Sequence, residues 1–228
     1  MKKILHIIAE TPLFNGLAED RLNQVRQIAV DKFYDKGKTV FLEGDDCNGF
    51  YIVADGKVKI YKVSVEGKEH ILHIYGSGNP FGEVPVFSGR KFPASAQTLL
   101  KSHLLFFPRT AFVDLISSNP SLALNMLAVL SMRLRQFTVQ IENLSLKEVP
   151  GRLASYLLYL TKEQGRLDSV TLSISKGQLA SLLGTIPETL SRILGKMNQQ
   201  HLIEARGREI KILDFSGMED LAEYGKLQ

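Results

Sequence analysis

The side chains best suited to chemistry lie between residues 175 and 197. Glu188, Ser191 and Arg192 are spaced i, i+3 and i+4, so in a helix they share one face near its start. An arginine can donate two hydrogen bonds to O6 and N7 of guanine, and a glutamate can accept one from N4 of cytosine. This spacing predicts a helix that reads base edges in the major groove of DNA. The structural alternative is an ordinary i, i+4 ion pair between Glu188 and Arg192.

Two helical patterns joined by a glycine must position these side chains. Ser175 is expected to cap the first helix, which buries leucines at 179, 182 and 183. Gly184 supplies the tight turn. Thr185 is expected to cap the second helix, with Pro187 tolerated in its first turn. Thr185 and Glu188 also fit a capping box, a second structural alternative. The inward face of the second helix is expected to consist of Leu190, Ile193, Leu194 and Met197.

A basic β-hairpin is predicted to follow this helix pair. Two β-rich segments, at 202–205 and 209–213, flank Arg206, Gly207 and Arg208. Such a hairpin would form a wing placed for DNA phosphates. Residues 147–213 hold ten Lys and Arg against six Asp and Glu, whereas the net charge of the whole chain is only +4. Positive charge is therefore modestly concentrated around the helix pair.

A long helix is predicted from residue 121 to about residue 147, with apolar residues in alternating steps of four and three. This regular a/d seam is typical of a coiled coil and predicts a symmetric homodimer. The alternative is a single amphipathic helix lying on its own β-domain. The apolar series consists of Ala123 followed by the predicted interface residues Leu127, Leu130, Leu134, Phe137, Ile141 and Leu144.

A proline and a glycine then interrupt the helical pattern. We interpret Val149, Pro150 and Gly151 as a hinge, because proline disfavours helix at the preceding residue and glycine adds flexibility. Three parts follow from this division. Residues 1–120 would be a sensor domain with flanking helices, residues 121–148 the dimerisation helix, and residues 149–228 the DNA-binding domain.

Between residues 33 and 107 the sequence has the texture of an antiparallel β-structure. Short β-branched and aromatic runs are separated by turn signals about every ten residues, which indicates a sandwich or barrel. Asp55 and Gly56, between two alternating segments, are the clearest hairpin signal. Before this region, Leu22, Val25 and Ile28 fall on one face of a predicted helix. The fold class is therefore α+β.

The composition is that of a soluble globular protein, with 44% hydrophobic and 23% charged residues in a chain of 228. No apolar run approaches the roughly 18 residues needed to span a bilayer. The basic and apolar start lacks a signal-peptidase site, so we expect no secretory signal and no membrane association. Cys47 is the single cysteine, which excludes an internal disulfide and a four-thiolate iron–sulfur cluster. A reducing, cytoplasmic location fits best, and no nucleophile–base motif indicates an enzyme.

Taken together, these features resemble the Crp/Fnr family of transcription regulators. The run from 187 to 193, PETLSRI, carries the resemblance most specifically. It implies a jelly-roll β-roll of the cyclic-nucleotide-binding type, a dimerisation helix and a winged helix-turn-helix. By resemblance, Glu188, Ser191 and Arg192 would read TGA half-sites in an inverted repeat, and RNA polymerase would be a partner. The residues implied to lie near phosphates are Ser175, Lys176, Thr189, Arg206, Gly207 and Arg208.

Within that family the chain most resembles the nitric-oxide-responsive branch, the dissimilatory nitrate respiration and HcpR regulators. The runs behind this likeness are PASAQ at 93–97, PSLAL at 120–124, LSMRL at 130–134, IENLSLK at 141–147 and GREIKIL at 207–213. The resemblance implies haem as the group that binds nitric oxide. An imidazole can ligate haem iron. No motif selects the axial ligand among the candidates His6, His70, His73 and His103.

Cyclic AMP is not the expected effector. Cyclic-AMP binders of the family carry Gly-Glu and then Arg-Ser about ten residues later; here Gly82 and Glu83 are present, but Phe92 and Pro93 occupy the second pair of positions. A buried phosphate would lack its cationic partner. A cyclic-nucleotide-responsive regulator remains the first alternative, and a haem or ligand carrier without regulatory DNA binding the second.

Overall fold

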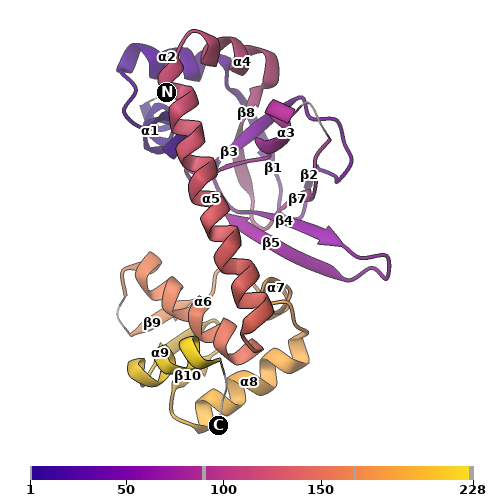
Figure 1. Ribbon diagram of the computed structural model, residues 1–228, viewed down its shortest axis with the longest axis vertical. Helices are drawn as coiled ribbons and strands as arrows, with labels where there is room; N and C mark the ends of the chain where they lie inside the picture. The colour runs from indigo at the N-terminus through magenta and orange to yellow at the C-terminus, as the bar shows by residue number, and fades with distance from the viewer. Residues whose placement is uncertain (1, 89–90, 167, 226–228) are drawn as a thin grey trace. The chain divides into compact units, whose positions relative to one another are not determined.

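The computed structural model describes residues 2–88, 91–166 and 168–225 (Figure 1). The chain divides into two compact units, at residues 1–134 and 135–228, and the division falls within one long helix. Within the described residues no single helix is long and apolar enough to cross a membrane; one bent pair, Arg109–Ser117 with Pro120–Leu146, meets the length and composition criteria together.

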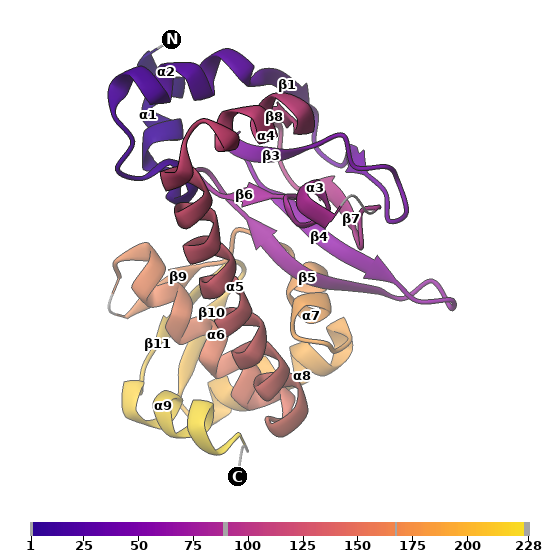
Figure 2. The same cartoon turned by 45° about the horizontal axis from the view of Figure 1, so that its top comes forward.

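The first unit is built around two four-stranded antiparallel sheets, ordered β1-β8-β3-β6 and β2-β7-β4-β5. This confirms the antiparallel β-structure. In Figure 2 the β4–β5 hairpin extends beyond the neighbouring strands of its sheet. The strands are β1 (Val30–Tyr34), β2 (Thr39–Phe41), β3 (Gly49–Asp55), β4 (Val58–Val63), β5 (Glu69–Tyr75), β6 (Pro80–Phe81), β7 (Ser95–Thr98) and β8 (Ser102–Pro108).

The hairpin predicted at Asp55 and Gly56 is wrong, because the strands on its two sides belong to different sheets. Strand β3 pairs with β6 and β8, whereas β4 pairs with β5 and β7. Gly56 has φ +97°, and a Cβ there would collide with Ser102. The glycine therefore permits a close crossing between sheets, which local sequence does not distinguish from a hairpin turn.

Helices and a 3-10 turn complete this unit. They are α1 (Lys2–Glu10), the 3-10 turn η1 (Pro12–Phe14), α2 (Glu19–Ile28), α3 (Val84–Ser88) and α4 (Arg109–Ser117). Val25 is fully buried, and Leu22 and Ile28 pack beside it, which confirms the predicted inner face of α2. An aromatic cluster holds the core: the rings of Phe50 and Phe107 stack at 4.9 Å.

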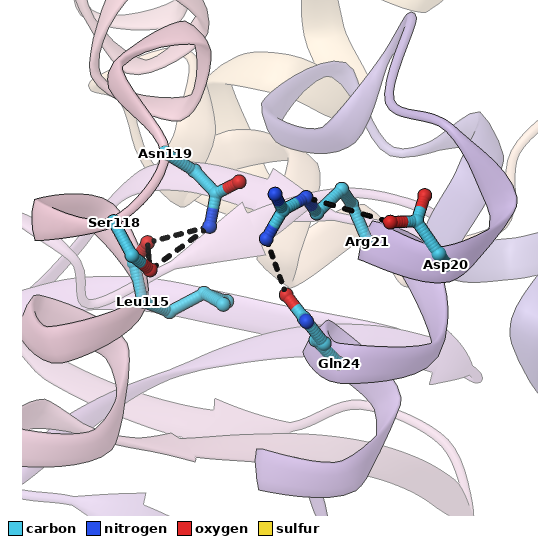
Figure 3. A network of polar contacts seen from close by, with 6 residues as sticks. All are labelled: Asp20, Arg21, Gln24, Leu115, Ser118 and Asn119. Carbon is cyan, nitrogen blue, oxygen red and sulfur yellow. Dashed lines mark hydrogen bonds and ion pairs between the residues drawn. The ribbon is translucent and has the colours of Figure 1, made fainter.

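Ser118 and Asn119 separate α4 from α5 (Pro120–Leu146), which begins one residue before the expected residue 121. Asn119 Nδ2 donates to the Leu115 carbonyl oxygen at 3.0 Å and to Ser118 Oγ at 3.1 Å, which satisfies groups at the end of α4 (Figure 3). The nearby Arg21 side chain of α2 contacts Asp20 and Gln24 of its own helix (Figure 3). The amide of Asn119 thus fixes the corner from which α5 departs.

The second unit has a three-stranded sheet, ordered β10-β11-β9, surrounded by helices. Its C-terminal helix α9, which was not predicted from the sequence, packs against α6 (Figure 2). The elements are α6 (Val149–Gln164), β9 (Ser169–Thr171), α7 (Lys176–Leu182), α8 (Pro187–Gln199), β10 (Ile203–Arg206), β11 (Glu209–Ile212) and α9 (Phe215–Tyr224).

Val149, Pro150 and Gly151 do not interrupt a helix; they form the first turn of α6. Proline is tolerated there because the first N–H groups of a helix have no intrahelical acceptor. A Cβ on Gly151 would lie 2.6 Å from Gly225 Cα, so this glycine serves close packing against the end of α9. The interruption lies earlier, at Lys147 and Glu148.

Candidate nucleic-acid interface and sensor region

Helix α7 begins at a complete capping box. Gln178 N donates to Ser175 Oγ at 3.2 Å, and Ser175 N donates to Gln178 Oε1 at 2.9 Å. The predicted capping role of Ser175 is confirmed, and Gln178 is the reciprocal partner that the sequence analysis missed. Lys176, the first residue of α7, is exposed.

The turn between α7 and α8 follows the prediction at Gly184 but not at Thr185. Gly184 has φ +66°, a conformation that glycine adopts without strain. Ile186, not Thr185, is the N-cap of α8, and it makes no side-chain capping bond. Thr185 instead donates its backbone N–H to the Ala180 carbonyl oxygen at 2.9 Å, within the turn. The capping-box alternative for Thr185 and Glu188 is therefore excluded.

Helix α8 presents the predicted reading face to solvent. Its inward residues are buried as expected, namely Leu190, Ile193, Leu194 and Met197. Glu188, Ser191 and Arg192 are exposed. The alternative ion pair between Glu188 and Arg192 is not among the salt bridges of the described residues. Both charged side chains thus remain available for an external partner.

Gly195 continues this exposed face, three residues after Arg192 and four after Ser191. A Cβ at Gly195 would meet no atom within 4 Å. A glycine inside a helix is destabilising by about 0.5–1 kcal/mol relative to alanine. No packing within the molecule requires this glycine.

A cleft of about 400 Å³ separates the start of α6 from one side of α8. Three cationic side chains line it: Arg152, Arg192 and Lys196. The remaining lining residues are Glu148, Val149, Pro150, Thr189 and Ile193. Arg152 and Lys196 were not predicted from the sequence, although the i, i+4 spacing of Lys196 from Arg192 was an available signal. Thr189, implied to lie near phosphates, faces this cleft.

Arg152 connects the cleft with the end of α5. Its Nη1 donates to the Leu144 carbonyl oxygen at 3.2 Å. Its Nε is buried and has no hydrogen-bond partner among the residues that the structure describes. Burial lowers the pKa of Arg152 below its usual range, because the charged form loses hydration.

The predicted wing is confirmed as the antiparallel hairpin of β10 and β11. Gly207, with φ +62°, makes its turn. Ala205 N donates to Asn198 Oδ1 at 3.0 Å, which ties the wing to α8. Arg206 pairs with Glu204, so a phosphate would have to compete with that carboxylate, whereas Arg208 extends from the exposed turn.

In the first unit, the predicted effector region is occupied by the chain's own side chains. Glu83 is buried and pairs with Arg133 of α5, whose guanidinium lies 5.0 Å from the Tyr75 ring centroid. Glu83 Oε2 has no partner among the described residues. Arg133, which the sequence analysis missed, also donates to the Pro80 carbonyl oxygen.

Phe92 is a core residue in this region. Its ring stacks on Phe41 at 3.7 Å, and a Cβ on Gly82 would approach both rings to 3.2 Å. Pro93, the next residue, is exposed. Neither Phe92 nor Pro93 offers a donor to an anion, as the sequence analysis expected.

The four candidate haem ligands lie in different environments. His6 is on the surface near Glu10, and His103 Nε2 contacts Asp31 at 2.8 Å. His70 is half-buried on β5. Burial and the charge of Arg133 lower the pKa of His73 from 6.5 to about 4, so its imidazole is neutral near pH 7. The described residues include no group of three or more His, Cys, Asp or Glu that could hold a metal ion.

The long helix α5 carries two separate apolar stripes. Leu122, Met126 and Val129 are buried in the core of the first unit. The predicted seam is mostly exposed: Leu130 is half-buried, while Leu127, Leu134, Phe137, Ile141 and Leu144 are exposed. The alternative of a helix packed on its own β-domain thus describes one stripe, and the other is open along the predicted a/d positions.

Comparison with known proteins assigns both units. Residues 31–119 match the cyclic nucleotide-binding domain, and residues 151–221 match the Crp-like helix-turn-helix domain. The chain is 30% identical over 213 residues to the Cyclic AMP receptor protein of Thermus thermophilus, covering 93% of this chain and 97% of that protein. It is 27% identical to the Fumarate and nitrate reduction regulatory protein of Vibrio cholerae, covering 92% and 86%.

Among solved structures, FixK2 from Bradyrhizobium japonicum has a TM-score of 0.76 at 22% identity, with 85% of this chain and 97% of that chain covered. This likeness confirms the predicted α+β fold of β-sheet domain, long helix and helix-turn-helix.

Proposed function

Because this chain belongs to the Crp/Fnr family of DNA-binding transcription regulators, we propose that it acts as a homodimer on inverted-repeat DNA sites. The observation that carries the proposal is the exposed reading face of α8 beside a cleft lined by three cations. A twofold protein dimer matches a twofold operator, with half-site centres about one helical turn apart.

The half-sites are proposed to contain TGA, read by Glu188, Ser191 and Arg192. Their donors and acceptors suit guanine and cytosine edges. The test is binding of the purified protein to a duplex with two inverted TGA half-sites, compared with the same duplex carrying altered TGA steps, at one fixed salt concentration. Equal affinity for both duplexes would contradict the assignment of the half-site.

For the signal we propose nitric oxide, sensed in the β-domain through haem. Of the four candidates we choose His73 for testing, because its imidazole is neutral near pH 7, whereas those of His6 and His103 contact carboxylates. Bound haem would supply the iron that takes up nitric oxide, and His73 would hold that iron. RNA polymerase is the proposed partner at promoters.

A cyclic nucleotide is the second candidate signal, favoured by the 30% identity to a cyclic AMP receptor protein. The two candidates are separated by one pair of measurements. An absorption spectrum of the haem-loaded protein should shift on addition of nitric oxide, and His73→Ala should abolish the haem spectrum while DNA binding persists. Micromolar binding of cyclic AMP in calorimetry, with no such spectrum, would replace the haem proposal.

A further inference from the structure

We propose that the cleft between α6 and α8 binds one phosphate of the DNA backbone, and that Arg152 links this phosphate to the end of α5. This inference rests on the proposed DNA-binding function and names a further contact for it. Arg152 and Lys196 are the residues that it adds to the interface.

The first support is the charge of the cleft. Arg152, Arg192 and Lys196 face the same space, and Glu148 is the only acidic residue of the described lining. Like charges held together repel one another, and an anion between them removes that cost. A phosphate diester provides the matching charge and several acceptor oxygens for guanidinium and ammonium donors.

The second support is the state of Arg152. Its guanidinium has five N–H donors; Nη1 is bonded to the Leu144 carbonyl oxygen, while the buried Nε has no partner in the described chain. Burial removes hydration from the guanidinium and so lowers the pKa of Arg152. A phosphate in the cleft would compensate the Arg152 guanidinium for the hydration that it loses on burial.

The third support is the position of the cleft beside the reading face. Thr189, Arg192 and Lys196 are spaced i, i+3 and i+7, so they form one strip along α8. Arg192 belongs to this strip and also to the reading face with Glu188 and Ser191. A strand whose bases meet the reading face would therefore carry its backbone past the strip, which favours DNA over a free phosphate ion.

The link to α5 follows from two positions of Arg152: its side chain lines the cleft and also contacts the Leu144 carbonyl oxygen of α5. It bridges the interruption at Lys147 and Glu148 through the Leu144 carbonyl, and Lys147 Nζ lies 3.3 Å from Ser155 Oγ across the same interruption. A phosphate held by Arg152 would restrain this junction. DNA binding would then stiffen the connection between the dimer helix and the DNA-binding domain.

The test uses the full-length protein and three charge-neutralising variants: Lys196→Gln, Arg152→Gln and the control Lys162→Gln, an exposed lysine in the last turn of α6. Affinity for the inverted-repeat duplex is measured across a salt series. Lys196→Gln should reduce the slope of log affinity against log salt by about 0.9, the value of one phosphate contact, on specific and scrambled DNA alike. Lys162→Gln should leave the slope unchanged.

The second readout is amide hydrogen exchange at residues 146–151, with and without saturating DNA. DNA should slow this exchange in the parent and in Lys162→Gln, and the slowing should be lost in Arg152→Gln. Because Arg152→Gln could weaken folding, its thermal midpoint without DNA is measured, and the slope of Lys196→Gln tests the phosphate contact independently.

An unchanged salt slope in Lys196→Gln would overturn the DNA-phosphate assignment. Retained slowing of exchange in a folded Arg152→Gln variant would overturn the link to α5. A parent protein that binds no DNA would instead overturn the proposed function itself, so the two failures are distinguishable.

Discussion

At the scale of single residues, function depends on side chains whose polar groups remain unused inside the protein. Arg192 is exposed at the border between the reading face of α8 and the cationic cleft. Glu83, in contrast, is buried and uses its carboxylate against Arg133 within the first unit. The first arrangement is suited to an external partner, and the second ties α5 to the β-sheet domain of the same chain.

Arg192→Ala should weaken specific DNA binding by about 1–3 kcal/mol and relax base choice at one position of each half-site, because a bidentate base contact is lost. Affinities for operator variants substituted at each position would show this. Arg21→Ala, a half-buried arginine on α2 outside the DNA-binding domain, is the charge-matched control. An Arg192→Ala protein with unchanged base preferences would contradict the assigned role.

Arg133→Met should destabilise the protein by about 3–5 kcal/mol, since it leaves the Glu83 carboxylate buried without its charge partner. The double variant Glu83→Met with Arg133→Met should recover much of that loss, because neither charge remains. Urea unfolding of the two variants measures both values. A double variant as unstable as Arg133→Met would show that packing of the arginine, not charge, dominates.

Sequence reasoning located Arg192 but not its cationic neighbours. The spacing of Glu188, Ser191 and Arg192 is local to one helix, and the helix forms as expected. Arg152 lies 40 positions earlier in the chain, and only folding brings it to the cleft with Lys196. Arg133 meets Glu83 for the same reason, across 50 positions. Contacts between distant segments carry no periodic signal.

At the scale of elements, the predictions that were wrong concern a helix start and a turn. Ser175 caps α7 as expected, since its side chain needs only the backbone three residues later. Thr185 does not cap α8, because its backbone N–H donates to the Ala180 carbonyl oxygen within the turn and α8 begins two residues later, at Pro187. The hairpin prediction at Gly56 is wrong, because a glycine with positive φ also permits the close crossing from one sheet to the other.

Gly195→Ala should stabilise α8 by about 0.5–1 kcal/mol, because alanine loses less backbone entropy and its Cβ meets no atom within 4 Å. The same methyl group would lie on the reading face, so specific DNA affinity should fall although the protein becomes more stable. Thermal unfolding and binding to specific and scrambled duplexes provide the two readouts. A variant that is more stable and binds the operator as tightly as the parent would show that Gly195 does not approach DNA.

At the scale of the whole molecule, the central expectation is a symmetric dimer through α5. Its seam residue Ile141 is 64% exposed in the single chain, and Val139, also 54% exposed, points to the opposite side of the helix. The regular a/d spacing made this surface predictable from sequence. The second apolar stripe, Leu122, Met126 and Val129, packs in the core of the first unit. It was not predicted as a separate surface, because both stripes belong to the same helix.

Ile141→Glu should convert the dimer to monomers at micromolar concentration, since it places a charge in each half of an apolar seam. Val139→Glu introduces the same charge on the opposite face and should leave the dimer intact. Sedimentation velocity distinguishes the two species. Dissociation by both variants, or by neither, would contradict the assigned seam.

The most direct test of the account is a titration of the protein into a duplex with two inverted TGA half-sites, with both affinity and stoichiometry measured at fixed salt. The account predicts two chains per duplex, a preference of at least about a thousandfold over scrambled DNA, and a large loss of affinity when one half-site is scrambled. One chain per duplex, or equal affinity for scrambled DNA, would contradict it.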